Sequence, residues 1–260
     1  MTKLYGWASY MAPFLDHAYV TSSKGHAWPC WGGAEDGREI CSGPGDAGVA
    51  DCISEPDSEA GIEYGLTGAC HQTANRILWP AGVTVSKAGG HALSALVWGV
   101  YGTPTKTAER EWRERIARCS GSPADIAASN PAFGKEEKEY MEKLIGLHLQ
   151  TVERGPLETL ALETELLIGF RLPGAGGTLV EKVLGIQKEL LAQKEALDQV
   201  LRDRSIDGRR YALEVNNLIY KALEQSLRFL KPDQFERLFG LKPGVRCDVV
   251  VPEIAAKHHG

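Results

Sequence analysis

The composition of this chain changes near residue 105, and that change constrains the fold more than any single motif. The first hundred residues are rich in Gly, Trp and Cys and alternate short apolar runs with turn-forming residues, a pattern typical of short strands. From about residue 105 onward, Glu, Lys, Arg, Leu and Ala predominate, and their apolar positions follow a helical period. We therefore predict an α+β chain with two parts, residues 1–104 and residues 105–260.

The first part is predicted to hold a small antiparallel sheet and two helices. Residues 17–21 and 26–31 resemble two short strands joined by a turn. Residues 32–61 have no helical period and many turn formers, so we expect a long loop there. A helix over 68–79 begins after small residues and ends at a proline, and a second, apolar helix covers 89–102.

The second part is predicted to be mostly helical. Two long amphipathic segments, 178–205 and 209–230, are separated only by an Asp-Gly break, which favours an antiparallel helix hairpin. A short helix over 232–240 follows, and 245–251 is expected to be a terminal strand or extended arm. Three further helices are predicted upstream of the hairpin, over 108–119, 130–153 and 156–170.

Charge and hydropathy exclude several classes of partner. The chain carries 29 Lys and Arg against 34 Asp and Glu, a net charge of −5, so neither nucleic acid nor an anionic membrane is expected to bind. No stretch approaches the ~20 apolar residues of a membrane span. The first residues lack the basic-then-apolar pattern of a secretory signal. We expect a cytoplasmic location, with signal-free secretion left open.

The six cysteines are spread over the chain rather than paired in knuckles. A chain of this size and core content is not expected to need disulfides. Cys30, Cys41 and Cys52 are spaced by eleven residues, and a zinc site built from them with His26 is an alternative to a catalytic cysteine. The full set is Cys30, Cys41, Cys52, Cys70, Cys119 and Cys247.

Cys70 is the strongest candidate for chemistry. It falls in the first turn of the helix predicted over 68–79, and a helix N-terminus lowers the pKa of a thiol and so favours the reactive thiolate. The free backbone N–H groups there could also hold an oxyanion during attack on a carbonyl. The competing interpretation is a buried, inert cysteine, which is common for this residue type.

Two histidines upstream strengthen the catalytic interpretation. A catalytic thiol needs an imidazole within hydrogen-bonding reach, and that imidazole needs a third group to orient it. His17 opens one predicted strand and His26 opens the next. Pairing of these strands would bring the two rings together, so that one could orient the other.

These elements resemble the circularly permuted branch of the NlpC/P60 papain-like superfamily, which includes the lecithin-retinol acyltransferase-like proteins. The matching segments are DHAYVTSSKGHAW, with His17 and His26, and TGACHQTANRI, with Cys70. The resemblance covers roughly residues 14–102 and implies a papain-like sheet with a nucleophile helix. It also implies Cys70 as nucleophile, His17 as base, His26 as orienting partner, and no cofactor.

Four more residues are predicted to line the site. His71 adjoins Cys70 on another helix face, and Gln72 could donate to an oxyanion. Trp28 could form an apolar wall. His91 begins the next helix and is a second candidate for the third catalytic position. Each also has an ordinary interpretation as a cap, core or helix-start residue.

The predicted activity is cleavage or transfer at an amide or peptide bond through a thioester, as a cysteine hydrolase or acyltransferase. An amide is expected rather than a lipid ester because the chain is acidic and lacks a membrane anchor. The alternative is a non-enzymatic adaptor that binds a protein partner, or a second copy of itself, through the C-terminal helices.

Overall fold

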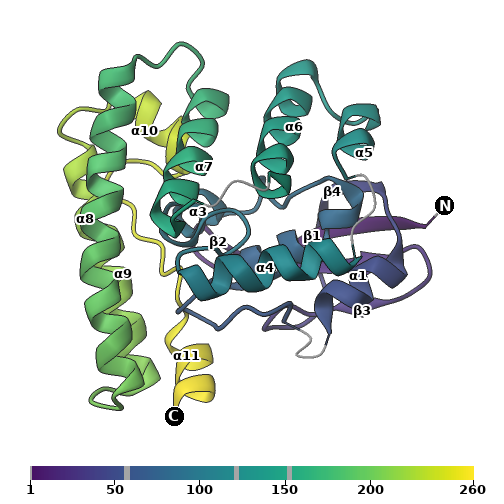
Figure 1. Ribbon diagram of the computed structural model, residues 1–260. Helices are drawn as coiled ribbons and strands as arrows, with labels where there is room; N and C mark the ends of the chain where they lie inside the picture. The colour runs from purple at the N-terminus through teal and green to yellow at the C-terminus, as the bar shows by residue number, and fades with distance from the viewer. Residues whose placement is uncertain (1, 56–58, 120–122, 151–153) are drawn as a thin grey trace.

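A computed structural model describes residues 2–55, 59–119, 123–150 and 154–260. The predicted α+β class is confirmed: an antiparallel sheet of four strands lies at the N-terminus and the rest of the described chain is mostly helical. Figure 1 shows the sheet on the right and a long helix pair on the left. Within the described part of the chain, no helix combines the length and apolar character that crossing a bilayer requires.

The sheet has the strand order β3-β2-β1-β4. The predicted strand over 17–21 is present as β2, whereas its partner β1, which supplies the longest pairing, was not predicted. The predicted long loop over 32–61 is wrong, because it contains strand β4 and helix α1. The strands are β1 (Lys3–Ala12), β2 (Leu15–Ser22), β3 (Ala27–Trp28) and β4 (Arg38–Pro44).

Helix α1 (Ala47–Ser54) is stabilised by a local N-cap, although its segment is rich in turn-forming residues. The side chain of Asp46 accepts a hydrogen bond from the amide of Gly48 at 2.7 Å, which satisfies a donor at the helix start. β4, just before it, is held by pairing with β1 from Lys3 to Ala8. Pairing with a distant strand, rather than its own composition, therefore makes this segment regular.

Two predicted helices form the centre of the molecule. They are α2 (Cys70–Ile77), followed by the short 3₁₀ helix η1 (Trp79–Ala81), and α3 (His91–Trp98). Every residue of α2 is buried, and α2 packs on β2. The hydrophobic core that contains Cys70 also contains alternate residues of β1 and β2: Leu4, Ala8, Ala18 and Val20.

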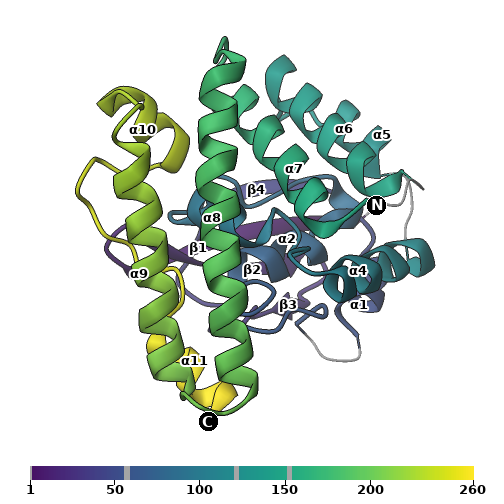
Figure 2. The same ribbon diagram turned by 60° about the vertical axis from the view of Figure 1, so that its left-hand side comes forward.

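The C-terminal half contains the predicted hairpin. Its helices α8 (Gly177–Arg202) and α9 (Gly208–Ser226) run side by side in both views (Figures 1 and 2). The arm predicted over 245–251 forms no strand pairs and leads into a further helix, α11. The remaining helices are α4 (Lys106–Cys119), α5 (Pro123–Ser129), α6 (Lys135–Leu149), α7 (Pro156–Arg171), α10 (Pro232–Phe239) and α11 (Pro252–His259).

The two hydrophobic cores do not follow the predicted division at residue 104. One core joins sheet residues such as Val20 to Trp112 and Leu144 of the helical half. The other joins Leu15 and Trp98 to the hairpin and the C-terminal arm. The helical half therefore completes the interior around α2 and α3, rather than standing apart from it.

Candidate functional site

Cys70 is the first residue of α2, as the sequence predicted. Its N-cap, Ala69, has an extended backbone with φ −139° and ψ −165°. The amide of Ala69 donates to Oε1 of Gln72 at 3.0 Å, so the side chain of the third helical residue closes back on the helix start. Gln72 is thus committed to capping, and its Nε2 donates to the carbonyl of Gly99 at 2.9 Å.

The surroundings of the Cys70 sulfur act in two directions on its ionisation. Burial is the largest influence and raises the thiol pKa to about 11, and the negative charge of Asp16 acts in the same direction. The backbone N–H groups of Ala18, His71 and Cys70 itself lower the pKa, but by less. The residue is 7% exposed. The expectation of a lowered pKa is therefore wrong for this conformation, because desolvation outweighs the helix N-terminus. The N–H groups still form a cradle suited to an anion.

His17 lies on β2 beside this cradle. The sulfur faces the N–H of Ala18, the residue that follows His17, so Cys70 lies against the peptide bond joining the two. Nε2 of His17 is 2.9 Å from the carbonyl oxygen of Gly33, whereas its buried Nδ1 has no partner among the described residues. Burial lowers the His17 pKa, and the carbonyls of Gly33 and Pro29 act in the opposite direction.

Cys70 lies against the backbone of β2 next to His17, whereas the His17 ring stacks on that of Tyr19, with 6.0 Å between ring centroids. Among the residues described, no hydrogen bond joins the Cys70 sulfur to any imidazole. The ring of His17 is neutral at neutral pH because its pKa is lowered.

His26 does not reach His17. The turn after β2 places His26 opposite Ser22, whose amide donates to the His26 carbonyl at 2.9 Å. His17 lies five residues before Ser22 on β2, which is roughly 16 Å away at the usual rise of a strand. The His26 side chain is 55% exposed, and its Nδ1 lies 3.3 Å from the carboxylate of Asp51. The structure therefore gives the predicted orienting partner a surface position.

The other predicted site residues are interior groups. His71 is fully buried, with Nε2 3.1 Å from the Asp16 carbonyl and Nδ1 3.0 Å from the Ser94 hydroxyl. Burial lowers its pKa to about 4. His91 is likewise buried, and its Nε2 accepts from Asn75 at 3.2 Å. Trp28 belongs to the core under the sheet. These residues hold the site together rather than line an open cleft.

A short segment around Trp31, predicted as the end of a strand over 26–31, follows the two-residue strand β3 and covers the site. Trp31 donates from Nε1 to the hydroxyl of Thr73 on α2 at 3.0 Å. Its ring lies 5.5 Å from the ring of Tyr64 and 4.5 Å from that of His258. His259, to which the sequence assigned no role, is 2.7 Å from the Tyr64 carbonyl. These contacts join residues up to 227 positions apart, so no local sequence pattern could have predicted them.

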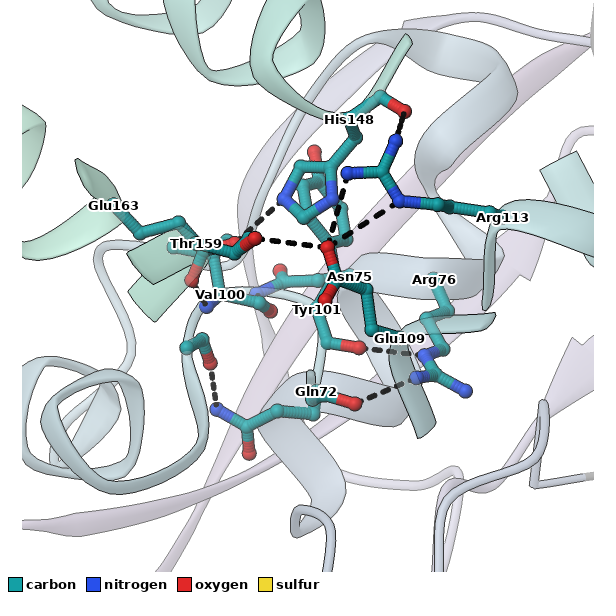
Figure 3. Close-up of polar contacts among 12 residues, drawn as sticks. Gln72, Asn75, Arg76, Val100, Tyr101, Glu109, Arg113, His148, Thr159 and Glu163 are labelled. Atoms are coloured by element: carbon teal, nitrogen blue, oxygen red, sulfur yellow. Dashed lines mark hydrogen bonds and ion pairs between the residues drawn. The ribbon is translucent and has the colours of Figure 1, made fainter. Parts of the chain in front are cut away.

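A buried polar network fixes the helical half to this region (Figure 3). Nε2 of His148 on α6 is 2.6 Å from the carboxylate of Glu163 on α7. The carboxylate of Glu109 on α4 accepts from Thr159 at 2.8 Å and from Arg113 at 3.0 Å. Three helices are thereby joined through carboxylates that are almost completely buried.

The same network reaches α2 through the segment after α3 (Figure 3). Glu163 accepts from the amide of Val100 at 2.7 Å, and the Val100 carbonyl accepts from Asn75 at 2.8 Å. Arg76, fully buried, donates from Nε to the Tyr101 carbonyl at 2.6 Å. The position of the helix that carries Cys70 therefore depends on residues almost a hundred positions downstream.

The hairpin supports the residues just before Cys70. Nζ of Lys194 on α8 donates to the Leu66 carbonyl at 2.9 Å and to Asp198 at 2.8 Å. The hydroxyl of Tyr211 on α9 donates to the Gly65 carbonyl at 2.8 Å. The loop that leads into α2 is thus anchored by buried donors of the hairpin.

The cysteines other than Cys70 do not form the alternative zinc site. Cys52 is in a disulfide with Cys119 (Cα–Cα 6.0 Å), which corrects the expectation that the chain has none and removes one ligand. Cys41 lies on β4, at the other edge of the sheet from β3. Within the described residues, no three His, Cys, Asp or Glu side chains are placed to hold a metal ion.

Comparisons with family models, curated proteins and solved structures found no match to this chain. The site must therefore be interpreted from its own geometry. That geometry defines a cysteine at a helix start, held in a cradle of backbone N–H groups beside a strand histidine.

Proposed function

We propose that this chain is a cysteine-dependent enzyme of papain-like type, as the circularly permuted NlpC/P60 resemblance implies, that cleaves or transfers an amide or peptide bond. The observation that carries the proposal is the position of the Cys70 sulfur at the start of α2, against the N–H of Ala18 on the strand that carries His17. A nucleophile, a base and oxyanion donors thus come from one small region.

The proposed reaction uses a different residue for each step. Nδ1 of His17 takes the thiol proton, and the Cys70 thiolate attacks the substrate carbonyl carbon. Backbone N–H groups around the sulfur stabilise the oxyanion. The imidazolium then protonates the leaving amine as the C–N bond breaks. Water or another acceptor displaces the thiolate from the thioester, and the proton returns to sulfur through His17.

Access to the sulfur is part of the proposal. Cys70 is 7% exposed and Trp31 lies over α2, so a substrate must displace covering side chains to reach it. Displacement would also change the desolvation that raises the Cys70 pKa. The negative net charge favours neutral or basic peptide substrates over anionic ones.

The deciding experiment measures thiol reactivity at Cys70 in the purified full chain. Iodoacetamide is added near neutral pH, and adducts are quantified by peptide mass spectrometry. The free thiols of Cys30, Cys41 and Cys247 serve as internal references. We expect Cys70 to react at least about ten-fold faster than the buried Cys247, because an imidazole-assisted thiolate is the reactive species.

The matched variant is His17→Gln. It should reduce the Cys70 alkylation rate to that of Cys247 and abolish turnover of a fluorogenic peptide-amide library. Equal, slow labelling of all four thiols in the wild-type chain would contradict the proposal. That result would favour the non-enzymatic adaptor, whose partner or second copy binds the helical half.

The cellular location of the chain is also part of the proposal. The sequence favours cytoplasmic synthesis, whereas the Cys52–Cys119 disulfide favours an oxidising destination, since disulfides persist mainly outside the reducing cytosol. We propose that the working form carries this disulfide. Thiol alkylation of the protein in intact cells, followed by mass measurement, tests this: modification of both cysteines without prior reduction would overturn it.

A further inference from the structure

The hydrogen bond between His17 and Gly33 determines which ring nitrogen is basic. A carbonyl oxygen can only accept, so Nε2, 2.9 Å from the Gly33 oxygen, must carry the proton in the neutral ring. The free electron pair is then on Nδ1, which is buried and has no partner among the described residues. A neutral imidazole in this tautomer is ready to accept a proton at Nδ1.

The segment that presents this carbonyl has an unusual backbone. Cys30 and Trp31 are consecutive non-glycine residues with positive φ, 50° and 76°, a conformation that costs energy and persists only where the surroundings enforce it. Trp31 is anchored by its bond to Thr73. Cys30 is completely buried, and its thiol donates to the Trp28 carbonyl at 3.3 Å.

Gly32 brings the segment close to the ring of His17. A Cβ built on Gly32 would lie 2.6 Å from both Cε1 and Nε2 of His17, nearer than a side chain can approach. The absence of a side chain at this position is therefore what lets the neighbouring carbonyl meet the imidazole edge.

We propose that the main-chain carbonyl of Gly33, presented by the turn Pro29–Gly33, is the positioning group for the base His17, in the role first assigned to His26. This inference rests on the proposed function for its catalytic meaning. The turn holds the Nε2–H tautomer, leaves Nδ1 as the basic ring nitrogen, and stabilises the imidazolium formed during the reaction.

The primary test reads the tautomer directly. Long-range ¹H–¹⁵N correlation spectra of the uniformly ¹⁵N-labelled full chain near neutral pH distinguish protonated from unprotonated ring nitrogens, and His17→Gln assigns the His17 signals. We expect His17 to show a protonated Nε2 and an unprotonated Nδ1. A protonated Nδ1, or the exchanging mixture of a free imidazole, would overturn the proposal whether or not the chain is active.

Two glycine variants separate the ring contact from general disturbance of the loop. Gly32→Ala places a methyl against the ring, so the tautomer signature should be lost and kcat/KM should fall roughly 100-fold. Gly33→Ala meets nothing within 4 Å and keeps its carbonyl, so the wild-type tautomer should remain. An unchanged tautomer in Gly32→Ala would contradict the positioning role.

A third variant tests the original candidate. His26→Gln removes the exposed ring that pairs with Asp51, and the His17 spectrum should be unchanged. Loss of the Nε2–H tautomer in His26→Gln would return the positioning role to that residue. If the tautomer is as expected but Cys70 shows no enhanced alkylation, the proposed enzyme fails while the assignment of His17 to Gly33 stands.

Discussion

The carboxylate of Glu163 lies 2.6 Å from Nε2 of His148, and both side chains are sealed from solvent, at 2% and 0% exposure. The other oxygen of Glu163 accepts from the amide of Val100, whose carbonyl holds Asn75 of α2. A pair of residues in the helical half therefore fixes the helix of the candidate nucleophile. Because buried polar groups are costly when unpaired, this arrangement couples the stability of the two halves.

Replacing Glu163 tests that coupling. Glu163→Ala leaves the His148 ring and the Val100 amide without an acceptor, so the free energy of unfolding should fall by about 3–5 kcal/mol, the range for a broken buried pair. Urea unfolding followed by circular dichroism measures the loss. Glu165→Ala, on the exposed face of the same helix, should change stability by less than about 0.5 kcal/mol. Equal effects of the two variants would refute the coupling.

Lys194 provides a second test, at the loop before Cys70. Lys194→Met removes the donor to the Leu66 carbonyl and the partner of Asp198. The free energy of unfolding should fall by about 3 kcal/mol, because the buried carboxylate of Asp198 loses its positively charged partner. Amide hydrogen exchange over residues 63–68 should accelerate more than in α9. The exposed Lys188→Met is the control, and unchanged exchange in Lys194→Met would show that the loop is held otherwise.

The disulfide gives a third prediction. Cys52 and Cys119 close a loop with a sequence separation of 67, and a cross-link of that length stabilises by about 4 kcal/mol in the chain-entropy description. Reduction should lower the urea midpoint of the wild-type chain accordingly. The variant with Cys52→Ser and Cys119→Ser should start from the lower midpoint and not respond to reductant. If the urea midpoint of the wild-type chain did not change on reduction, the disulfide would not form in solution.

Local patterns allowed part of this fold to be predicted. The α8–α9 hairpin follows from helical periodicity and an Asp-Gly break, and α2 follows from small residues before Cys70 and a proline after Trp79. In contrast, β1 and β4 become strands by pairing with each other over a separation of up to 41 residues. Such pairing depends on the partner more than on the segment itself.

Only the secondary-structure positions of Cys70 and His17 were predictable in the candidate site. The sequence placed Cys70 at a helix start and His17 on a strand, and both positions are found. It could not indicate that the turn after β2 carries His26 away from His17, or that a main-chain carbonyl at Gly33 meets the ring. It also could not give the degree of burial that raises the Cys70 pKa, because burial depends on segments that are distant in the sequence, such as β1 and α4 in the same core.

Acid sensitivity is the fourth prediction, and it centres on His71. Burial lowers the pKa of this histidine to about 4 in the folded chain, against an ordinary value near 6.5. Above that value both the folded and unfolded states are neutral, so His71 contributes no pH dependence. As the pH falls from about 6.5 to about 4, the unfolded state binds a proton that the folded state does not, so stability falls by about 3 kcal/mol. His17 and His91, whose pKa values burial also lowers, act in the same direction.

Urea unfolding at a series of pH values measures this loss, and two variants assign it. His71→Gln removes the titrating ring while leaving groups able to bond the Asp16 carbonyl and the Ser94 hydroxyl, so its unfolding free energy should depend less steeply on pH in the acid range. His26→Gln, on the surface, should retain the full loss. An identical slope in wild type and His71→Gln would mean that His71 titrates alike in both states, which is incompatible with a ring sealed between β2 and α3.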